Sequence, residues 1–168
     1  MKQLLLVSWL LSLSAILGLP EVKADVRMPL IFGNHMVLQQ DTRITIWGWA
    51  DAGENIEVLF AGQKVRTTAN ADGTWQVKLK PVKTKKKGET LTITGKNKLV
   101  YSDVLVGDVW VASGQSNMEW GIKVRKEYAD DIAHSEDSLL RLFFVPKNTS
   151  LQPLSEIEIP QGTASPER

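Results

Sequence analysis

Alternation of apolar and polar residues dominates the chain from Arg27 to about Asp103. It is clearest in residues 44–49, 56–58 and 75–79, where every second side chain is apolar. A period of two is typical of strands that bury one face and expose the other. No helical period competes in this stretch, so the sequence predicts a series of short β-strands.

Turn signals separate these predicted strands. The sequence Asn70-Ala71-Asp72-Gly73 offers the Asp-Gly pair that favours a tight hairpin, and further turns are expected at 51–53 and 61–62. A lysine-rich loop at 83–88 leads into another strand at 90–94. Short strands at this spacing, without helices between them, predict an all-β sandwich formed by residues 25–103.

The pattern changes after Asp103. Residues 104–106 and 109–112 are apolar without alternation, as in a strand covered on both faces. An amphipathic helix is expected to begin near Arg125 or Lys126, and residues 142–145 resemble a second buried strand. Strand, helix and strand in this order predict the start of an α/β domain over residues 104–168.

The first 24 residues have the composition of a cleaved secretory signal. Lys2 precedes an apolar run over residues 4–19, and small residues flank Lys23. The alternatives are a membrane anchor or a buried N-terminal helix, but the run contains serines and a glycine and is shorter than the roughly 20 residues of a membrane span. We therefore expect an exported protein, periplasmic or extracellular, without a membrane span after cleavage.

Composition narrows the chemistry. With 20 basic and 19 acidic side chains the net charge is +1, so nothing favours a nucleic acid or an anionic membrane as partner. The absence of cysteine excludes disulfides and thiolate catalysis. The two histidines, His35 and His134, are too few and too far apart in sequence to indicate a metal site.

Ser116 is the candidate nucleophile. It follows the apolar run 109–112 and the turn residue Gly114, and Asn117 follows it at the expected start of a helix. A serine between a buried strand and a helix start has backbone N–H groups beside it that can stabilise an oxyanion. The alternative is that Ser113, Ser116 and Asn117 are ordinary turn and capping residues.

Several motifs resemble the sialate O-acetylesterase family, a branch of the SGNH hydrolases. The most specific is Gly114-Gln115-Ser116-Asn117-Met118-Glu119-Trp120, which resembles the nucleophile block of that family. Upstream and downstream blocks match in order and cover nearly the whole mature chain: Gly33-Asn34-His35-Met36-Val37-Leu38-Gln39-Gln40, Ile46-Trp47-Gly48-Trp49-Ala50, Asp72-Gly73-Thr74-Trp75, Val104-Leu105-Val106-Gly107-Asp108-Val109-Trp110, Leu140-Arg141-Leu142-Phe143 and Ala164-Ser165-Pro166-Glu167.

The resemblance implies a fold and an activity. The fold would be the sandwich that precedes the hydrolase domain, followed by the first part of a flavodoxin-like, three-layer α/β domain. Ser116 would attack the acetyl group of an O-acetylated sialic acid or related sugar, without a metal or organic cofactor. The remaining oxyanion-hole residues and the catalytic histidine would lie beyond Arg168, so the resemblance implies an inactive fragment. Neither His35 nor His134 is expected to replace that base.

A second hypothesis is a non-catalytic, exported β-sandwich that binds glycans or other partners. Trp47, Trp49 and Trp75 are the candidates for stacking on sugar rings, with packing in the sheet as their alternative role. The sequence indicates no oligomeric state for either hypothesis.

Overall fold

The computed structural model describes residues 25–121 and 125–157, which are rich in strands and contain little helix. The predicted signal segment therefore lies outside the described residues. The strands are β1 (Val37–Gln39), β2 (Ile44–Trp49), β3 (Asn55–Phe60), β4 (Gln63–Thr68), β5 (Thr74–Leu79), β6 (Lys85–Thr94) and β7 (Lys98–Gly107). Three short helical elements follow: η1 (Ser116–Glu119), η3 (Lys126–Tyr128) and α2 (Ala129–Ala133).

The strands form two sheets. A mixed five-stranded sheet has the order β1-β7-β6-β3-β4, and a two-stranded sheet pairs β2 with β5. Within the larger sheet β1 runs parallel to β7, whereas β7-β6, β6-β3 and β3-β4 are antiparallel. The register of β1 places Gln39 opposite Gly107, where β7 ends.

Side chains from both sheets form one hydrophobic core. The alternation predicted from the sequence is seen in β2, β3 and β5, where every second residue is buried and the residues between are more exposed. Residues from β2, β3, β5, β6 and β7 belong to the same cluster of buried side chains. Its largest fully buried members are Phe60, Ile46, Ile56, Leu79, Leu91, Ile93, Val58 and Val104. Removal of this apolar surface from water is the main force that stabilises the unit.

The predicted turn at Gly73 is confirmed, but the hairpin is not: the strands that it joins, β4 and β5, belong to different sheets and do not pair with each other. Gly73 has φ +79° between β4 and β5, a conformation that residues with a Cβ rarely adopt. Its N–H donates to the carbonyl of Asn70 (2.9 Å), and Asn70 N–H donates to the carbonyl of Thr74 (2.8 Å). The turn thus fixes the start of β5 and the register of the strand that contains Trp75.

Two boundaries differ from the sequence prediction. Lys85–Lys87, expected in a loop, belong to β6, because their backbone pairs with β7 while their side chains remain exposed. Val104–Val106, assigned to the α/β domain, are buried in β7 and continue the β unit past the expected boundary at residue 103. The division of the chain into two domains stays a prediction.

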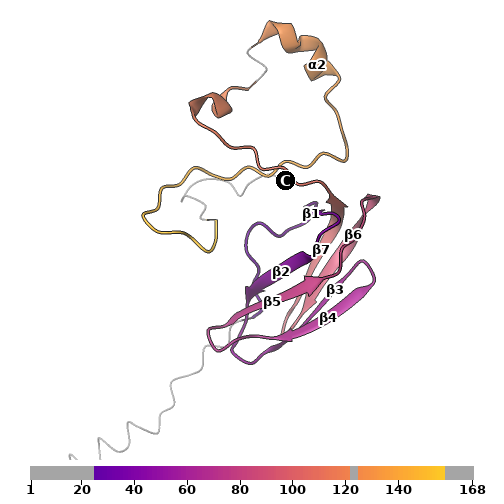
Figure 1. Ribbon diagram of the computed structural model, residues 1–168, viewed down its shortest axis with the longest axis vertical. Coiled ribbons are helices and arrows are strands. Elements are labelled where there is room, and N and C mark those ends of the chain that lie inside the picture. Colours follow the sequence, from indigo (N-terminus) through magenta and orange to yellow (C-terminus); the bar gives the residue numbers. More distant parts are fainter. Residues whose placement is uncertain (1–24, 122–124, 158–168) are drawn as a thin grey trace, which may run out of the picture.

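The chain after β7 differs more strongly. Residues 109–112 and 142–145, predicted as buried strands, lie outside strands and are largely exposed. The predicted amphipathic helix is reduced to η3 and α2, which ends at Ala133. Buried parallel strands require neighbouring strands and helices on both faces. The described residues beyond Gly107 contain no strand, and their only α-helix, α2, has five residues. Figure 1 shows this segment at one end of the β unit, with α2 furthest from it.

Candidate active site

The chain that contains Ser116 leaves the β unit where β7 ends. Val104–Val106 are at most 5% exposed, whereas Trp110 is 89% and Val111 91% exposed. The transition from core to solvent therefore takes place within a few residues of Gly107. Figure 1 shows the chain continuing from the end of β7 towards the segment that holds η1.

Ser116 is the first residue of η1 and its side chain is exposed. Gln115 precedes it in an extended conformation (φ −105°, ψ −159°). The turn is closed by two backbone bonds, from Met118 N–H to Gln115 O (2.9 Å) and from Trp120 N–H to Asn117 O (3.2 Å). The predicted helix start at Ser116 is thus present as a single 3₁₀ turn, although residues 109–112 before it do not form the predicted strand.

Gly114 leaves space for the side chain of Met118 in this turn. A Cβ at this position would lie 2.8 Å from Cγ of Met118, closer than ordinary contact allows. The glycine therefore lets the Met118 side chain fold back across the turn. The N–H groups of Ser116 and Asn117 lie at the start of a helical turn, where backbone donors have no intrahelical partner. They are suited to an oxyanion that forms next to the serine.

Neither histidine of the chain is held against Ser116. His134 directly follows α2, and its Nδ1 lies 2.7 Å from the carbonyl oxygen of Asp130. His35 lies in the loop before β1, and its Nδ1 is 2.7 Å from Oδ2 of Asp103. A general base must reach the proton that it removes, and Nδ1 of each ring lies beside an oxygen of another residue. That neither histidine is the base stays a prediction.

Asp103 joins the β unit to the later segment. Its Oδ2 accepts from His35 and from Nη2 of Arg141 (3.0 Å), and His35 and Asp103 both have positive φ, +62° and +51°. Histidine and aspartate tolerate this region better than most residues. The hydrogen bond with His35 is the largest influence that lowers the pKa of Asp103 below 3.8; desolvation opposes it and Arg141 adds to it.

The three tryptophans singled out from the sequence occupy different environments. Trp75 is 2% exposed and packs in the core, so the packing alternative holds for this residue. Trp49 lies under the guanidinium of Arg27, 4.0 Å from the ring centroid, and Arg27 bonds to Glu156. Trp47 is 37% exposed and meets Phe32 edge to face at 4.7 Å between ring centroids.

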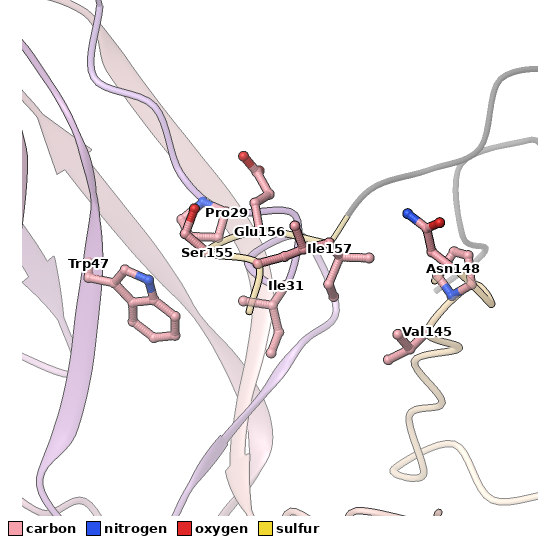
Figure 2. A pocket seen from close by; sticks show the side chains of 10 residues that line it. Pro29, Ile31, Trp47, Val145, Asn148, Ser155, Glu156 and Ile157 are labelled. Carbon is pink, nitrogen blue, oxygen red and sulfur yellow. The ribbon is translucent and has the colours of Figure 1, made fainter. Parts of the chain in front are cut away.

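Trp47 borders a cleft of about 370 Å³ between the β unit and residues 145–157. Figure 2 shows Trp47 on one side and Val145 and Asn148 on the other, with Ser155 and Glu156 between them. Pro29 and Ile31 add apolar surface to the same cleft. This surface offers an indole, an amide and hydroxyl or carboxylate groups within one depression.

The side chains of Gln39 and Gln40 contact the chain where it leaves β7, and sequence reasoning gave them no role. Gln39 Oε1 accepts from the N–H of Val109 (2.8 Å), and Gln40 Nε2 donates to Oδ1 of Asp108 (3.1 Å). The signal that marks them is their place in the block 33–40, one of the motifs on which the resemblance rests.

Within residues 25–121 and 125–157, no three His, Asp or Glu side chains gather in a way that would hold a metal ion. Among the helices that the structure describes, none is long and apolar enough to cross a membrane.

The chain is similar to curated sialate O-acetylesterases. It is 32% identical over 141 residues to the mouse (Mus musculus) protein and 34% identical over 141 residues to the rat (Rattus norvegicus) protein, alignments that cover 75% and 74% of this chain. The human (Homo sapiens) protein is 28% identical over 148 residues. The predicted family resemblance is confirmed. No family model matches the chain.

A solved structure agrees with these relatives. A carbohydrate acetylesterase from Xanthomonas citri superposes with a TM-score of 0.73 and 36% identity, over 79% of this chain. The chain spans only about a quarter of the length of the curated sialate O-acetylesterases, 26% for the mouse protein, and 31% of the Xanthomonas chain. The similarity therefore concerns one part of these enzymes.

Proposed function

We propose that this chain is the nucleophile-bearing part of an exported carbohydrate esterase that removes O-acetyl groups from sialic acid or related sugars. Ser116 is its nucleophile. The proposal is supported by the exposed serine at the start of η1, in the motif by which the sequence resembles sialate O-acetylesterases. The names of the relatives supply the substrate class, because fold alone does not define chemistry.

The reaction begins when Ser116 Oγ attacks the acetyl carbonyl carbon. A base takes the hydroxyl proton, and the carbonyl oxygen becomes an oxyanion held by backbone N–H groups of the serine turn. The C–O bond to the sugar then breaks, the sugar oxygen receives the proton, and water hydrolyses the acetyl-serine to acetate. No cofactor takes part in these steps.

The base must come from outside the described residues or from a partner. Loss of the histidine of a serine triad reduces turnover on the order of 10⁶-fold in a well-studied protease. We therefore expect the chain on its own to hydrolyse esters very slowly. We also propose that the two-sheet unit is the accessory sandwich and that residues 104–168 complete an α/β hydrolase domain only together with further chain.

A hybrid enzyme tests the role of Ser116. The segment of mouse sialate O-acetylesterase that aligns with this chain is replaced by the chain, and acetate release from O-acetylated sialic acid is measured. Ser116→Ala should reduce turnover by several orders of magnitude, because the nucleophile is lost. Ser113→Ala, in the same loop, is the matched control and should keep most of the activity. Equal turnover of the parent and the Ser116→Ala hybrid would contradict the proposal.

The second candidate function is glycan binding without catalysis, and the half-exposed Trp47 beside its cleft favours it. An indole face next to polar groups is a suitable surface for a sugar ring. Trp47→Ala should then reduce retention of the chain on an immobilised sialoglycan, whereas Trp110→Ala, at an exposed position on another segment, should leave it unchanged. Equal retention of both variants and the parent would exclude Trp47 as the binding residue.

A further inference from the structure

A strip of chain before β2 lies alongside the strand that leads to Ser116. Its centre is β1, which pairs in parallel with the last residues of β7. Before β1, Asn34 Oδ1 accepts from the N–H of Ser102 (2.9 Å), and His35 contacts Asp103. Residues 34–40 thus follow residues 102–109 on both sides of the short ladder.

Two adjacent glutamines extend this pairing beyond the point where the ladder ends. The last backbone bond is from Gln40 N–H to the carbonyl of Gly107 (2.9 Å). Beyond this point, side-chain hydrogen bonds take the place of backbone ones: Gln39 Oε1 accepts from Val109 N–H, and Gln40 Nε2 donates to Oδ1 of Asp108. Gln40 Oε1 also accepts from the N–H of Thr84 (3.2 Å), which ties the exit to the start of β6.

These glutamines contribute little to the core. The side chain of Gln39 is exposed, Gln40 is partly exposed, and neither belongs to the buried cluster. Their hydrogen bonds are directed at the chain that leaves the sheet. Only six residues separate Val109 from the turn residue Ser116, so the direction of this exit sets where the serine turn can lie.

We propose that Gln39 and Gln40 are positioning residues, which hold the segment after β7 in the direction that places Ser116 for attack. The inference rests on the proposed role of Ser116. It explains why a motif far from the nucleophile in sequence accompanies the nucleophile block. Gln39 requires an acceptor oxygen at its end, and Gln40 requires both a donor and an acceptor.

Two substitutions, one that removes the acceptor oxygen and one that keeps it, test the first residue. Gln39→Met removes the acceptor, whereas Gln39→Glu keeps it. In the methionine variant the Val109 amide proton should exchange with solvent roughly fivefold to tenfold faster, the ratio for a hydrogen bond of about 1–1.4 kcal/mol. Its amide resonance should move upfield, and both properties should return in the glutamate variant.

Exchange of the amide and the carboxylate between positions 40 and 108 tests the second residue, Gln40. Gln40→Glu places a carboxylate against Asp108 and removes the donor, so the exit should loosen. Combination with Asp108→Asn restores one donor and one acceptor across the same gap, and exchange of the residues 108–110 should return to the parental rate. Failure of the double variant to restore exchange would contradict the assigned hydrogen bond.

Gln63 provides a matched control elsewhere in the β unit. It contacts the chain that leaves β5 in the same manner: its Nε2 donates to Lys80 O (3.1 Å) and its Oε1 accepts from Lys80 N–H (2.8 Å). Gln63→Met should accelerate exchange at Lys80 and leave Val109 unchanged. In the hybrid enzyme, Gln39→Met should lower kcat at least several-fold with little change in KM, Gln39→Glu should restore kcat, and Gln63→Met should not alter it.

The outcomes separate this inference from the proposed function. Unchanged exchange at Val109 in Gln39→Met would overturn the inference, as would an equal rise in exchange throughout the core, which would indicate a general structural role. Accelerated exchange with unchanged kcat would also overturn it. If instead Ser116→Ala retains turnover, the proposed function fails, whereas the exchange results on Gln39 and Gln40 remain as measured.

Discussion

Glu54 is the only charged residue among the buried side chains of the described chain, at 8% exposure, and its removal should destabilise the β unit strongly. It lies just before β3, and its carboxylate accepts two backbone N–H groups, from Lys96 to Oε1 (2.6 Å) and from Asp51 to Oε2 (3.2 Å). It thereby joins the turn before β3 to the turn between β6 and β7. Gly95 makes room, because a Cβ there would lie 2.3 Å from Oε1.

The magnitude follows from these two bonds. A hydrogen bond to a charged group contributes about 1.5–3 kcal/mol, and a buried donor left without an acceptor costs a similar amount. Because water can enter the space that the side chain leaves, we expect Glu54→Ala to lower the free energy of unfolding by about 2–4 kcal/mol. Glu54→Gln keeps one acceptor oxygen and should cost about half of this. For a unit of this size, 2 kcal/mol corresponds to a fall in Tm of roughly 10 °C.

Urea denaturation followed by tryptophan fluorescence measures these free energies. Glu57→Ala is the control, because that carboxylate contacts Lys64 and Arg66 on the surface, where ion pairs contribute little. A loss below about 0.5 kcal/mol for Glu54→Ala, or equal losses for Glu54→Ala and Glu57→Ala, would refute the reasoning, since an exposed and a buried carboxylate would then be equivalent.

Three further predictions concern the core, the junction and the exposed segment. Phe60→Ala should cost about 3–5 kcal/mol in calorimetry because the side chain is fully buried; a loss under about 1 kcal/mol would contradict the core assignment. The pKa of Asp103 is lowered, so its contact with Arg141 should persist above pH 3.8 and be lost as the pH falls through the lowered pKa. Titration of this carboxyl group followed by NMR should show a larger rise of its pKa in His35→Ala than in Arg141→Ala, and the reverse order would refute the assignment. Because the indole of Trp110 is 89% exposed, we expect the chain to self-associate in sedimentation experiments and Trp110→Ser to reduce this association; equal association of the variant and the parent would contradict the role given to Trp110.

The β unit was predictable because its elements follow from local patterns. Alternation in residues 44–49 and 75–79 requires no knowledge of the partner strand, since one face of each strand enters the core. The turn at Gly73 follows from its backbone freedom. By contrast, β4 has a half-exposed pattern throughout, and its place in the sheet depends on pairing with β3 rather than on its own sequence.

The candidate site was predictable only as a sequence motif. Ser116 and the turn around it agree with the local pattern, because Gly114 and the first residues of η1 act within a few positions. The prediction of strands at 109–112 and 142–145 was wrong, because an apolar run becomes a buried strand only when neighbouring strands and helices cover it. The contacts of Gln39, Gln40 and Arg141 join residues far apart in sequence, which no periodicity reports.

The most direct test of the central claim is to trap the acyl intermediate in the hybrid enzyme. Reaction with an activated acetyl ester is stopped by acid within one turnover, and the digested protein is analysed by mass spectrometry. We expect an acetyl group on the Ser116 side chain of the peptide that contains it, and no such group in Ser116→Ala. Turnover with the acetyl group on another residue, or with no acetylated protein under conditions that trap a known serine esterase, would contradict it.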